Sequence, residues 1–186
     1  MNKQMVKELM TPVSHFPRIR DDATFSQAAG ALHKAQEDFA SGRTKQRILL
    51  VENNEGKIRG KLSPLDLMRG LEPEYEKVMD AKKGGAFVAN YEYVIKSMRE
   101  QLAILERPLA DICSKASTTR VGDFLRPVTD AQTIKAESSL NEALHRFIVG
   151  RFDSLFVLEN GRLSGILRFS DVYREVYKII TEECGL

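Results

Sequence analysis

The sequence is short of the residues that mark several common protein classes. Among its 186 residues it has only two cysteines, Cys113 and Cys184, which are too few for a disulfide framework and fit a reducing cytoplasm. Its net charge of +2 is too small to indicate nucleic acid as a partner. No uncharged apolar run approaches the roughly 18 residues of a membrane-spanning helix, and the first residues lack the apolar core of a secretory signal. We therefore expect a soluble, cytoplasmic protein without a membrane or nucleic-acid partner.

The motifs of many catalytic sites are missing as well. The three histidines and two cysteines form no metal-ligand cluster. The sequence contains neither a glycine loop that would cradle a phosphate nor the serine elbow of hydrolases. Asp66 and Asp171 could be imagined as a catalytic pair, but nothing near them indicates a raised pKa. We predict that the protein is not an enzyme and requires no metal or cofactor.

What the chain does contain is an internal repeat. The segment 6–13 returns 115 positions later at 121–128, and Gly60 and Asp66 return 105 positions later as Gly165 and Asp171. One copy of a repeat usually cannot bury its apolar face alone, so we expect the two copies to pack together. A cleft between two related halves is a common place for a ligand.

The spacing of apolar residues predicts the same order of elements in both copies: strand, helix, strand, strand, helix. In the first copy an extended stretch is followed by a helix, a buried strand, a returning strand and a second helix, at 11–17, 25–40, 48–51, 58–62 and from Ser63 onward. In the second copy these elements are expected at 133–134, 140–147, 155–158, 163–167 and 172–180, with a tight hairpin at Asn160-Gly161. The fold class is therefore α/β, of the α+β kind.

Residues between the copies match neither of them. Tyr91, Met98 and Leu105 belong to an apolar stripe with spacings of three and four, which predicts an amphipathic helix. Such a helix could cover the core of its own chain or contact the same helix of a second subunit, and the pattern favours neither. We thus expect a first repeat over 1–72, a helical linker over 73–117 and a second repeat over 118–186.

The strongest functional candidate is the segment from Gly60 to Asp66. It places the hydroxyl of Ser63 at a strand-to-helix junction and a carboxylate one turn into the helix. A helix N-terminus suits a phosphate, and a carboxylate can accept hydrogen bonds from the two vicinal hydroxyls of a ribose. The same two residues also make an ordinary helix cap. The recurrence of the pattern at Gly165 and Asp171 favours the nucleotide interpretation.

Taken with the segment Val6–Thr11 and the order of elements, this recurrence resembles the cystathionine-β-synthase (CBS) domain. The two copies resemble a tandem CBS pair, or Bateman module, with pseudo-twofold symmetry, and the resemblance covers roughly 1–72 and 118–181. The first copy matches the glycine, hydroxyl and aspartate of the family motif at Gly60, Ser63 and Asp66, although Lys61 stands at an apolar position. The second copy departs from the motif because Arg168 occupies the hydroxyl position.

The resemblance implies an adenosine-bearing regulatory ligand: AMP, ADP, ATP or S-adenosylmethionine. It assigns the ribose hydroxyls to Asp66 and Asp171, and the neighbourhood of ribose and phosphate to Ser63. The family's first strand contacts the base through its backbone, which points to 15–17 and 130–132, with His15, Pro17 and Gln132 as candidates. The side chain of His15 could touch a phosphate of the ligand or simply lie on an exposed strand. Arg168 could clamp a phosphate or fill the second site and close it.

Further cations precede the two buried strands, namely Lys45, Arg47 and Arg151. They could bind the phosphates of a ligand or be ordinary solvated surface charges. The expected function is a sensor of adenine nucleotides or S-adenosyl compounds that acts through an unknown partner protein or its own assembly, as a homodimer. The alternative is an interaction or dimerisation scaffold whose ligand sites have decayed.

Overall fold

The computed structural model describes residues 4–72 and 111–182, and these form two compact units. The first unit contains residues 1–16 and 127–186, and the second contains residues 17–126. The compact units therefore do not coincide with the repeat boundaries expected from the sequence. The apolar stripe from Tyr91 to Leu105, and most of the expected linker, lie outside the described residues.

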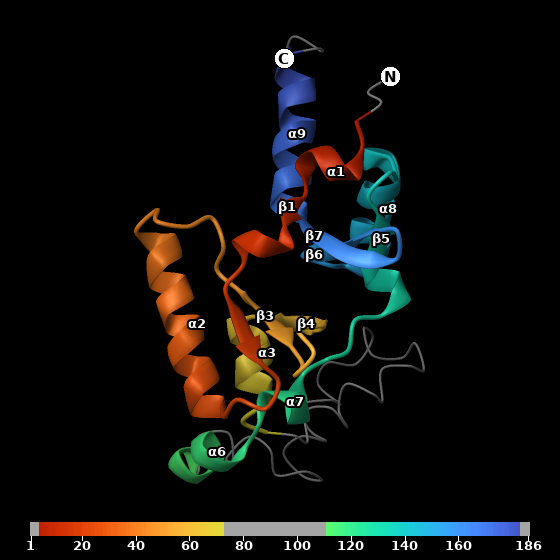
Figure 1. The fold of residues 1–186 in the computed structure, drawn as a ribbon. Coiled ribbons are helices and arrows are strands. Elements are labelled where there is room, and N and C mark those ends of the chain that lie inside the picture. Colours follow the sequence, from red (N-terminus) through yellow and green to blue (C-terminus); the bar gives the residue numbers. More distant parts are fainter. Residues whose placement is uncertain (1–3, 73–110, 183–186) are drawn as a thin grey trace, which may run out of the picture. The chain divides into compact units, whose positions relative to one another are not determined.

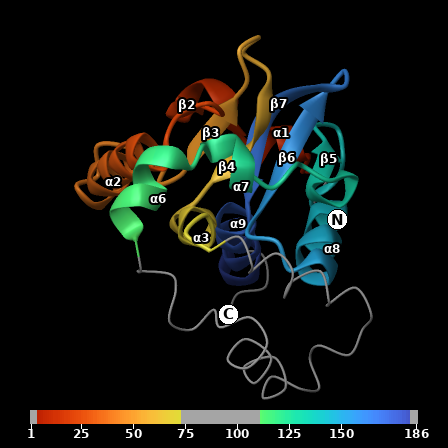
Figure 2. The same ribbon diagram turned by 90° about the horizontal axis from the view of Figure 1, so that it is seen from below.

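The second unit holds the first repeat around a three-stranded sheet of order β2-β3-β4 (Figure 1 and Figure 2). The strands are β2 (Arg18–Arg20), β3 (Leu49–Glu52) and β4 (Ile58–Leu62). Strand β2 is parallel to β3, and β4 is antiparallel to it. The helices of this unit are α2 (Phe25–Ala40), α3 (Pro64–Arg69), α6 (Ile112–Thr118) and α7 (Val121–Phe124).

The first unit holds the second repeat around a four-stranded sheet of order β1-β7-β6-β5 (Figure 1). Its strands are β1 (Thr11–Pro12), β5 (Thr133–Lys135), β6 (Ser154–Glu159) and β7 (Arg162–Arg168). Its helices are α1 (Val6–Leu9), α8 (Leu140–Gly150) and α9 (Phe169–Glu182), and two 3₁₀ turns, η1 (Val13–His15) and η5 (Asp130–Gln132), complete it.

The strands of the two sheets pair in equivalent registers, and this confirms the repeat at the level of the fold. Arg18 pairs with Leu50 in one parallel pair, and Thr133 pairs with Phe156 in the other. In both hairpins the register shifts just after the valine that faces the repeated glycine: Val51 opposite Gly60, and Val157 opposite Gly165. The mixed α/β fold and the order strand, helix, strand, strand, helix are thus confirmed for both repeats.

Local sequence chemistry explains the ends of the main elements. Thr24 caps α2 and Ser139 caps α8, each accepting a hydrogen bond from the backbone N–H three residues on. The hairpin between β6 and β7 has only Asn160 and Gly161 in its turn, with φ values of 50° and 74°. Asparagine and glycine tolerate such left-handed backbone, which is why this pair predicted the turn correctly.

The prediction of a continuous extended stretch over 11–17 was wrong, whereas the extended stretch predicted at 133–134 is confirmed as part of β5. The 3₁₀ turn η1 interrupts residues 11–17, and the 3₁₀ turn η5 takes up Asp130–Gln132. Pro12 and Thr129 are still extended, but a backbone hydrogen bond closes each turn, from Phe16 N–H to Val13 and from Gln132 N–H to Thr129. The short helix α1 was also not expected, because four residues are too few to show helical periodicity.

The N-terminal segment of each repeat packs in the unit that holds the rest of the other repeat. Val6 N–H donates to the carbonyl of Ser138 at 2.9 Å, in the unit of the second repeat. At the position 115 residues later, Val121 N–H donates to the carbonyl of Ala23 at 2.9 Å, in the unit of the first repeat. We call residues 4–12 and 119–126 the exchanged segments. The chain passes from one unit to the other after Phe16 and returns after Arg126.

Each core contains one fully buried valine from an exchanged segment. The core of the first unit gathers around Val6, with Ile134, Ala136, Leu140, Ala143, Phe147, Leu155, Val157, Leu167 and Val172. The core of the second unit gathers around Val121, with Phe25, Ala28, Leu32, Ala35, Leu49, Val51, Leu62, Leu67 and Leu71. In the described ranges no helix is long and apolar enough to cross a membrane.

Candidate functional site

One end of the β2-β3-β4 sheet carries most of the residues predicted for the first site. Pro17 directly precedes β2, and its carbonyl accepts a hydrogen bond of 2.9 Å from Leu50 N–H of β3. Leu49, the first residue of β3, pairs with Leu62, the last residue of β4. Since Ser63 follows Leu62, the register brings Pro17 and Ser63 to the same end of the sheet.

Ser63 and Asp66 hold each other at this end, where β4 turns into α3. The Ser63 hydroxyl donates to Asp66 Oδ2 at 2.5 Å, and Ser63 N–H donates to the same oxygen at 2.9 Å. In return, Asp66 N–H donates to Ser63 Oγ at 3.3 Å. With Pro64 at the first position this is a complete capping box, so the structural role expected of these residues is confirmed.

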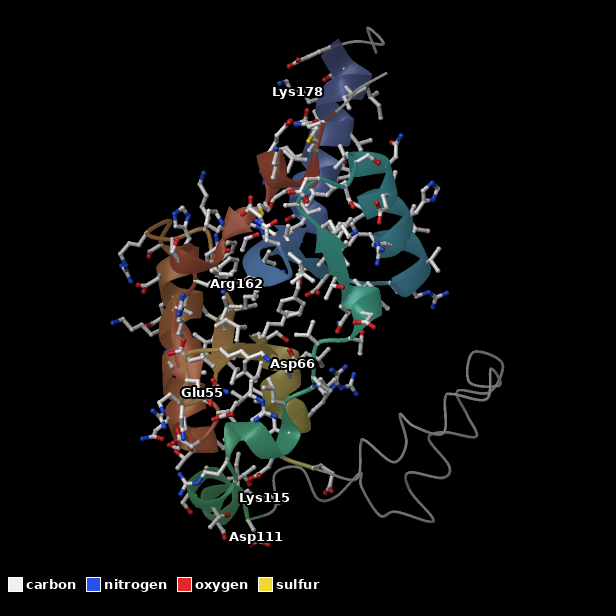
Figure 3. All side chains as sticks on the ribbon, turned by 45° about the vertical axis from the view of Figure 1, so that its right-hand side comes forward. Glu55, Asp66, Asp111, Lys115, Arg162 and Lys178 are labelled. Carbon is white, nitrogen blue, oxygen red and sulfur yellow. The ribbon has the colours of Figure 1, made fainter. Side chains whose placement is uncertain are left out.

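The Asp66 carboxylate nevertheless stays partly open to solvent. Its side chain is 21% exposed, and Figure 3 shows it on α3. Its second oxygen, Oδ1, accepts a hydrogen bond of 3.1 Å from the Arg69 guanidinium one turn along the helix. A partly exposed carboxylate beside a hydroxyl is an arrangement that can accept hydrogen bonds from a polar ligand.

The same place in the other unit is built differently. Asp171 is 7% exposed, and Arg168 donates to both of its oxygens, from Nε at 2.7 Å and from a terminal nitrogen at 3.0 Å. The Arg174 guanidinium adds a hydrogen bond of 3.2 Å to Oδ1. Arg168 ends β7 and Asp171 lies in the first turn of α9, so a bidentate ion pair takes the place of the capping box.

Sequence reasoning missed the arginines that follow each aspartate. Arg69 and Arg174 each stand three residues after the carboxylate they bind. They lie 105 positions apart, as Asp66 and Asp171 do, so the repeat itself held the signal that would have found them. Helical geometry explains the contact, because side chains three residues apart lie on one face.

Lys45 and Arg47 precede β3 and are both exposed. The Arg47 guanidinium lies 5.9 Å from the centroid of the Phe39 ring of α2, and the Arg47 carbonyl accepts a hydrogen bond from the Gln36 side chain. The Arg47 side chain therefore packs on α2. This contact limits how far its guanidinium group can extend toward a ligand beside Ser63.

The remaining predicted residues belong to the first unit. His15 is exposed in the 3₁₀ turn η1, and Gln132 is half-buried in the 3₁₀ turn η5, directly before β5. Arg151 is exposed and ends α8 in the left-handed region, with φ of 50°. Of the predicted residues, the structure thus brings together Ser63 with Asp66 and Arg168 with Asp171, each pair within its own unit.

A separate charged cluster follows β2. Arg20 donates to both oxygens of Asp22, at 3.0 and 2.7 Å. This hydrogen bonding lowers the pKa of the Asp22 carboxyl and raises the pKa of the Arg20 guanidinium. Both groups are exposed, so the pair belongs to the solvated surface. Across the residues that the structure describes, no group of three or more histidine, cysteine or acidic side chains is placed to hold a metal.

The chain is similar to known proteins that contain CBS domains. The family model of the CBS domain matches residues 121–178, which include β5 to β7, α8 and most of α9. The whole chain is similar to CBSX2, a CBS-pair protein from Arabidopsis thaliana, with a TM-score of 0.57 and 18% identity over 96% of this chain and 97% of that one.

The chain has the fold of a tandem CBS pair. A CBS domain-containing protein of unknown function from Bacillus anthracis is similar as well, with a TM-score of 0.59 and 16% identity over 95% of this chain and 94% of that one. A structure of CBSX2 in complex with AMP matches with a TM-score of 0.53 and 20% identity over 94% of this chain and 97% of that one. No curated protein sequence matches this CBS pair.

Proposed function

We propose that this CBS pair is a regulatory module that binds an adenosine-bearing ligand and passes its ligand state to another protein. The observation that carries the proposal is the partly exposed carboxylate of Asp66 beside the Ser63 hydroxyl, at the end of a CBS-type sheet. The CBSX2 structure in complex with AMP supports the ligand class, because that protein has the same fold.

In this proposal the ribose diol binds to the Asp66 carboxylate. The hydroxyl hydrogen of Ser63 can rotate away from Oδ2 and leave that oxygen free to accept a ligand hydroxyl. Arg69 stays on the other oxygen through its hydrogen bond of 3.1 Å to Oδ1. Within the second unit, backbone groups near Pro17 would contact the base, and Lys45 and Arg47 would attract phosphates. Within the first unit, backbone groups near His15 and Gln132 and the cation Arg151 are the candidates for the same roles.

The shortness of α3 argues against a phosphate at its N-terminus. The helix α3 has only six residues, and Asp66 N–H of its first turn already donates to Ser63 Oγ. We therefore assign affinity to the ribose contact rather than to a phosphate at the helix N-terminus.

The second candidate function is a scaffold whose ligand sites have decayed. The capping box at Ser63 and the ion pair at Asp171 favour it, because each aspartate already has a structural role. In both functions we propose a homodimer in the cytoplasm, and the protein that receives the signal is unknown.

Thermal denaturation with adenine nucleotides separates the two functions. A ligand present at a hundredfold its dissociation constant adds about 2.7 kcal/mol to the free energy of unfolding. For a chain of this size the midpoint should rise by roughly 5–10 °C. We expect AMP, ADP, ATP or S-adenosylmethionine to give this shift, and guanosine or cytidine nucleotides to give less. If no adenosine compound shifts the midpoint at millimolar concentration, the scaffold function is the correct one.

A further inference from the structure

The two repeats offer an aspartate at the same place, but the residue three positions earlier changes what that aspartate can do. Among the described residues, the Asp66 carboxylate accepts three hydrogen bonds, two from Ser63 and one from Arg69. The Asp171 carboxylate also accepts three, two from Arg168 and one from Arg174. Arg69 and Arg174 correspond in the repeat, so the difference between the sites rests on Ser63 and Arg168.

The number of lone pairs decides whether a ribose diol can bind. An ionised carboxylate has about four acceptor positions, so three hydrogen bonds leave about one, and a diol needs two. At Asp66, rotation of the Ser63 hydroxyl releases one of the three, and the hydroxyl remains available to the ligand. The first site therefore opens without breaking an ion pair.

At Asp171 the same release requires a bidentate ion pair to break. Arg168 donates through two nitrogens of a planar group, and both bonds are charge-assisted. The Asp171 side chain is 8% exposed, against 21% for Asp66, so water compensates less for a lost partner. The exposed Arg174 would remain, but its hydrogen bond of 3.2 Å engages only one oxygen.

We propose that Arg168 closes the second ligand site from within, so that the chain takes one adenosine ligand, at Asp66. The guanidinium of Arg168 occupies the two oxygens that a ribose diol would use. The same pairing holds the Arg168 side chain to α9, so it does not serve as a phosphate clamp. This inference rests on the proposed function, since it concerns how many of its two sites are open.

Calorimetric titration with AMP tests the inference on the full chain. Wild type should bind one AMP per chain. Arg168→Ser should bind a second AMP, because the substituted side chain can cap α9 as Ser63 caps α3. The reciprocal variant Ser63→Arg should weaken the first site by about tenfold or more. Arg174→Ser is the matched control, because it removes a cation from Asp171 without removing the bidentate pair, and its stoichiometry should stay at one.

The outcomes separate this inference from the proposed function. If wild type binds two AMP, or if its single site is lost in Asp171→Ala and kept in Asp66→Ala, Arg168 does not close the second site, while the proposed function stands. If a folded Arg168→Ser still binds one AMP, closure by Arg168 is also wrong. If neither wild type nor any variant binds AMP, ADP, ATP or S-adenosylmethionine, the proposed function fails and the inference fails with it. Circular dichroism of each variant establishes that it is folded, and Ser63→Arg provides the second test where Arg168→Ser does not fold.

Discussion

At the scale of single residues, two aspartates in matching positions have different surroundings. Asp66 is bound by a neutral hydroxyl, a backbone N–H and one guanidinium, whereas Asp171 is bound by two guanidinium groups. The sequence predicted that Ser63 caps a helix and that Arg168 departs from the pattern. It could not predict that Arg168 turns onto Asp171 rather than outward, because a flexible side chain is placed by the backbone of its own unit.

The first residue-scale prediction compares the two aspartates in ligand binding. Asp66→Ala removes a charged acceptor from two ribose hydroxyls, which should cost roughly 1.5–3 kcal/mol, or about 10- to 150-fold in affinity. Asp171→Ala should change the affinity much less, because its carboxylate is held by Arg168. Calorimetry with the adenine nucleotide that gives the largest thermal shift measures both. The ranking is reversed, and Asp66 is only a helix cap, if Asp171→Ala abolishes binding while Asp66→Ala keeps it.

At the scale of elements, local chemistry predicted ends and turns well and short segments poorly. The Asn160-Gly161 turn and the Ser63 cap each depend on two or three adjacent residues, and both were predicted. The four-residue helix α1 and the turns η1 and η5 depend on packing within the first unit, and adjacent residues do not encode them strongly.

Helix α9 carries an exposed apolar face, which the spacing of its apolar residues did not distinguish from the face that packs in the core. Val172 is fully buried and Val176 packs against the core. A neighbouring face exposes Tyr173 by 63% and Tyr177 by 57%, with Phe169 and Ile180 also exposed. Figure 3 places Lys178 of the same helix toward the C-terminal end. Exposed aromatic residues gathered along one helix are typical of a protein contact.

The element-scale prediction is that this face of α9 contributes to a homodimer. Wild type should scatter light as twice the chain mass of 21.0 kDa at micromolar concentration. The double variant Tyr173→Lys with Tyr177→Lys should shift the equilibrium toward the monomer, because it places charges in an aromatic contact. Val149→Lys is the control, since Val149 is 83% exposed on α8. A wild-type mass of 21.0 kDa across this range, or a double variant that stays dimeric, contradicts the prediction.

At the scale of the whole molecule, the exchanged segments make the two repeats depend on each other. Val6 is fully buried in the core around the second repeat, and Val121 is fully buried in the core around the first. Each repeated glycine also lies close to the exchanged segment of the other repeat. A Cβ on Gly165 would lie 2.9 Å from the Thr11 carbonyl oxygen, and one on Gly60 would lie 3.0 Å from the Arg126 carbonyl oxygen. The sequence revealed the two copies but not this exchange, because equivalent segments fit equivalent positions in either copy.

This exchange predicts that a core mutation loosens the repeat that lies far from it in the sequence. Val6→Ala removes apolar contact from the core of the first unit, at a cost of roughly 1–2 kcal/mol. Hydrogen exchange should therefore accelerate in β6 and β7, which lie in the second repeat, and change little in β3 and β4. Val121→Ala should give the opposite result, with faster exchange in β3 and β4. Lys7→Ala, at an exposed side chain beside Val6, should leave both patterns unchanged. Faster exchange confined to β3 and β4 in Val6→Ala would mean that the segment 4–12 packs on its own repeat.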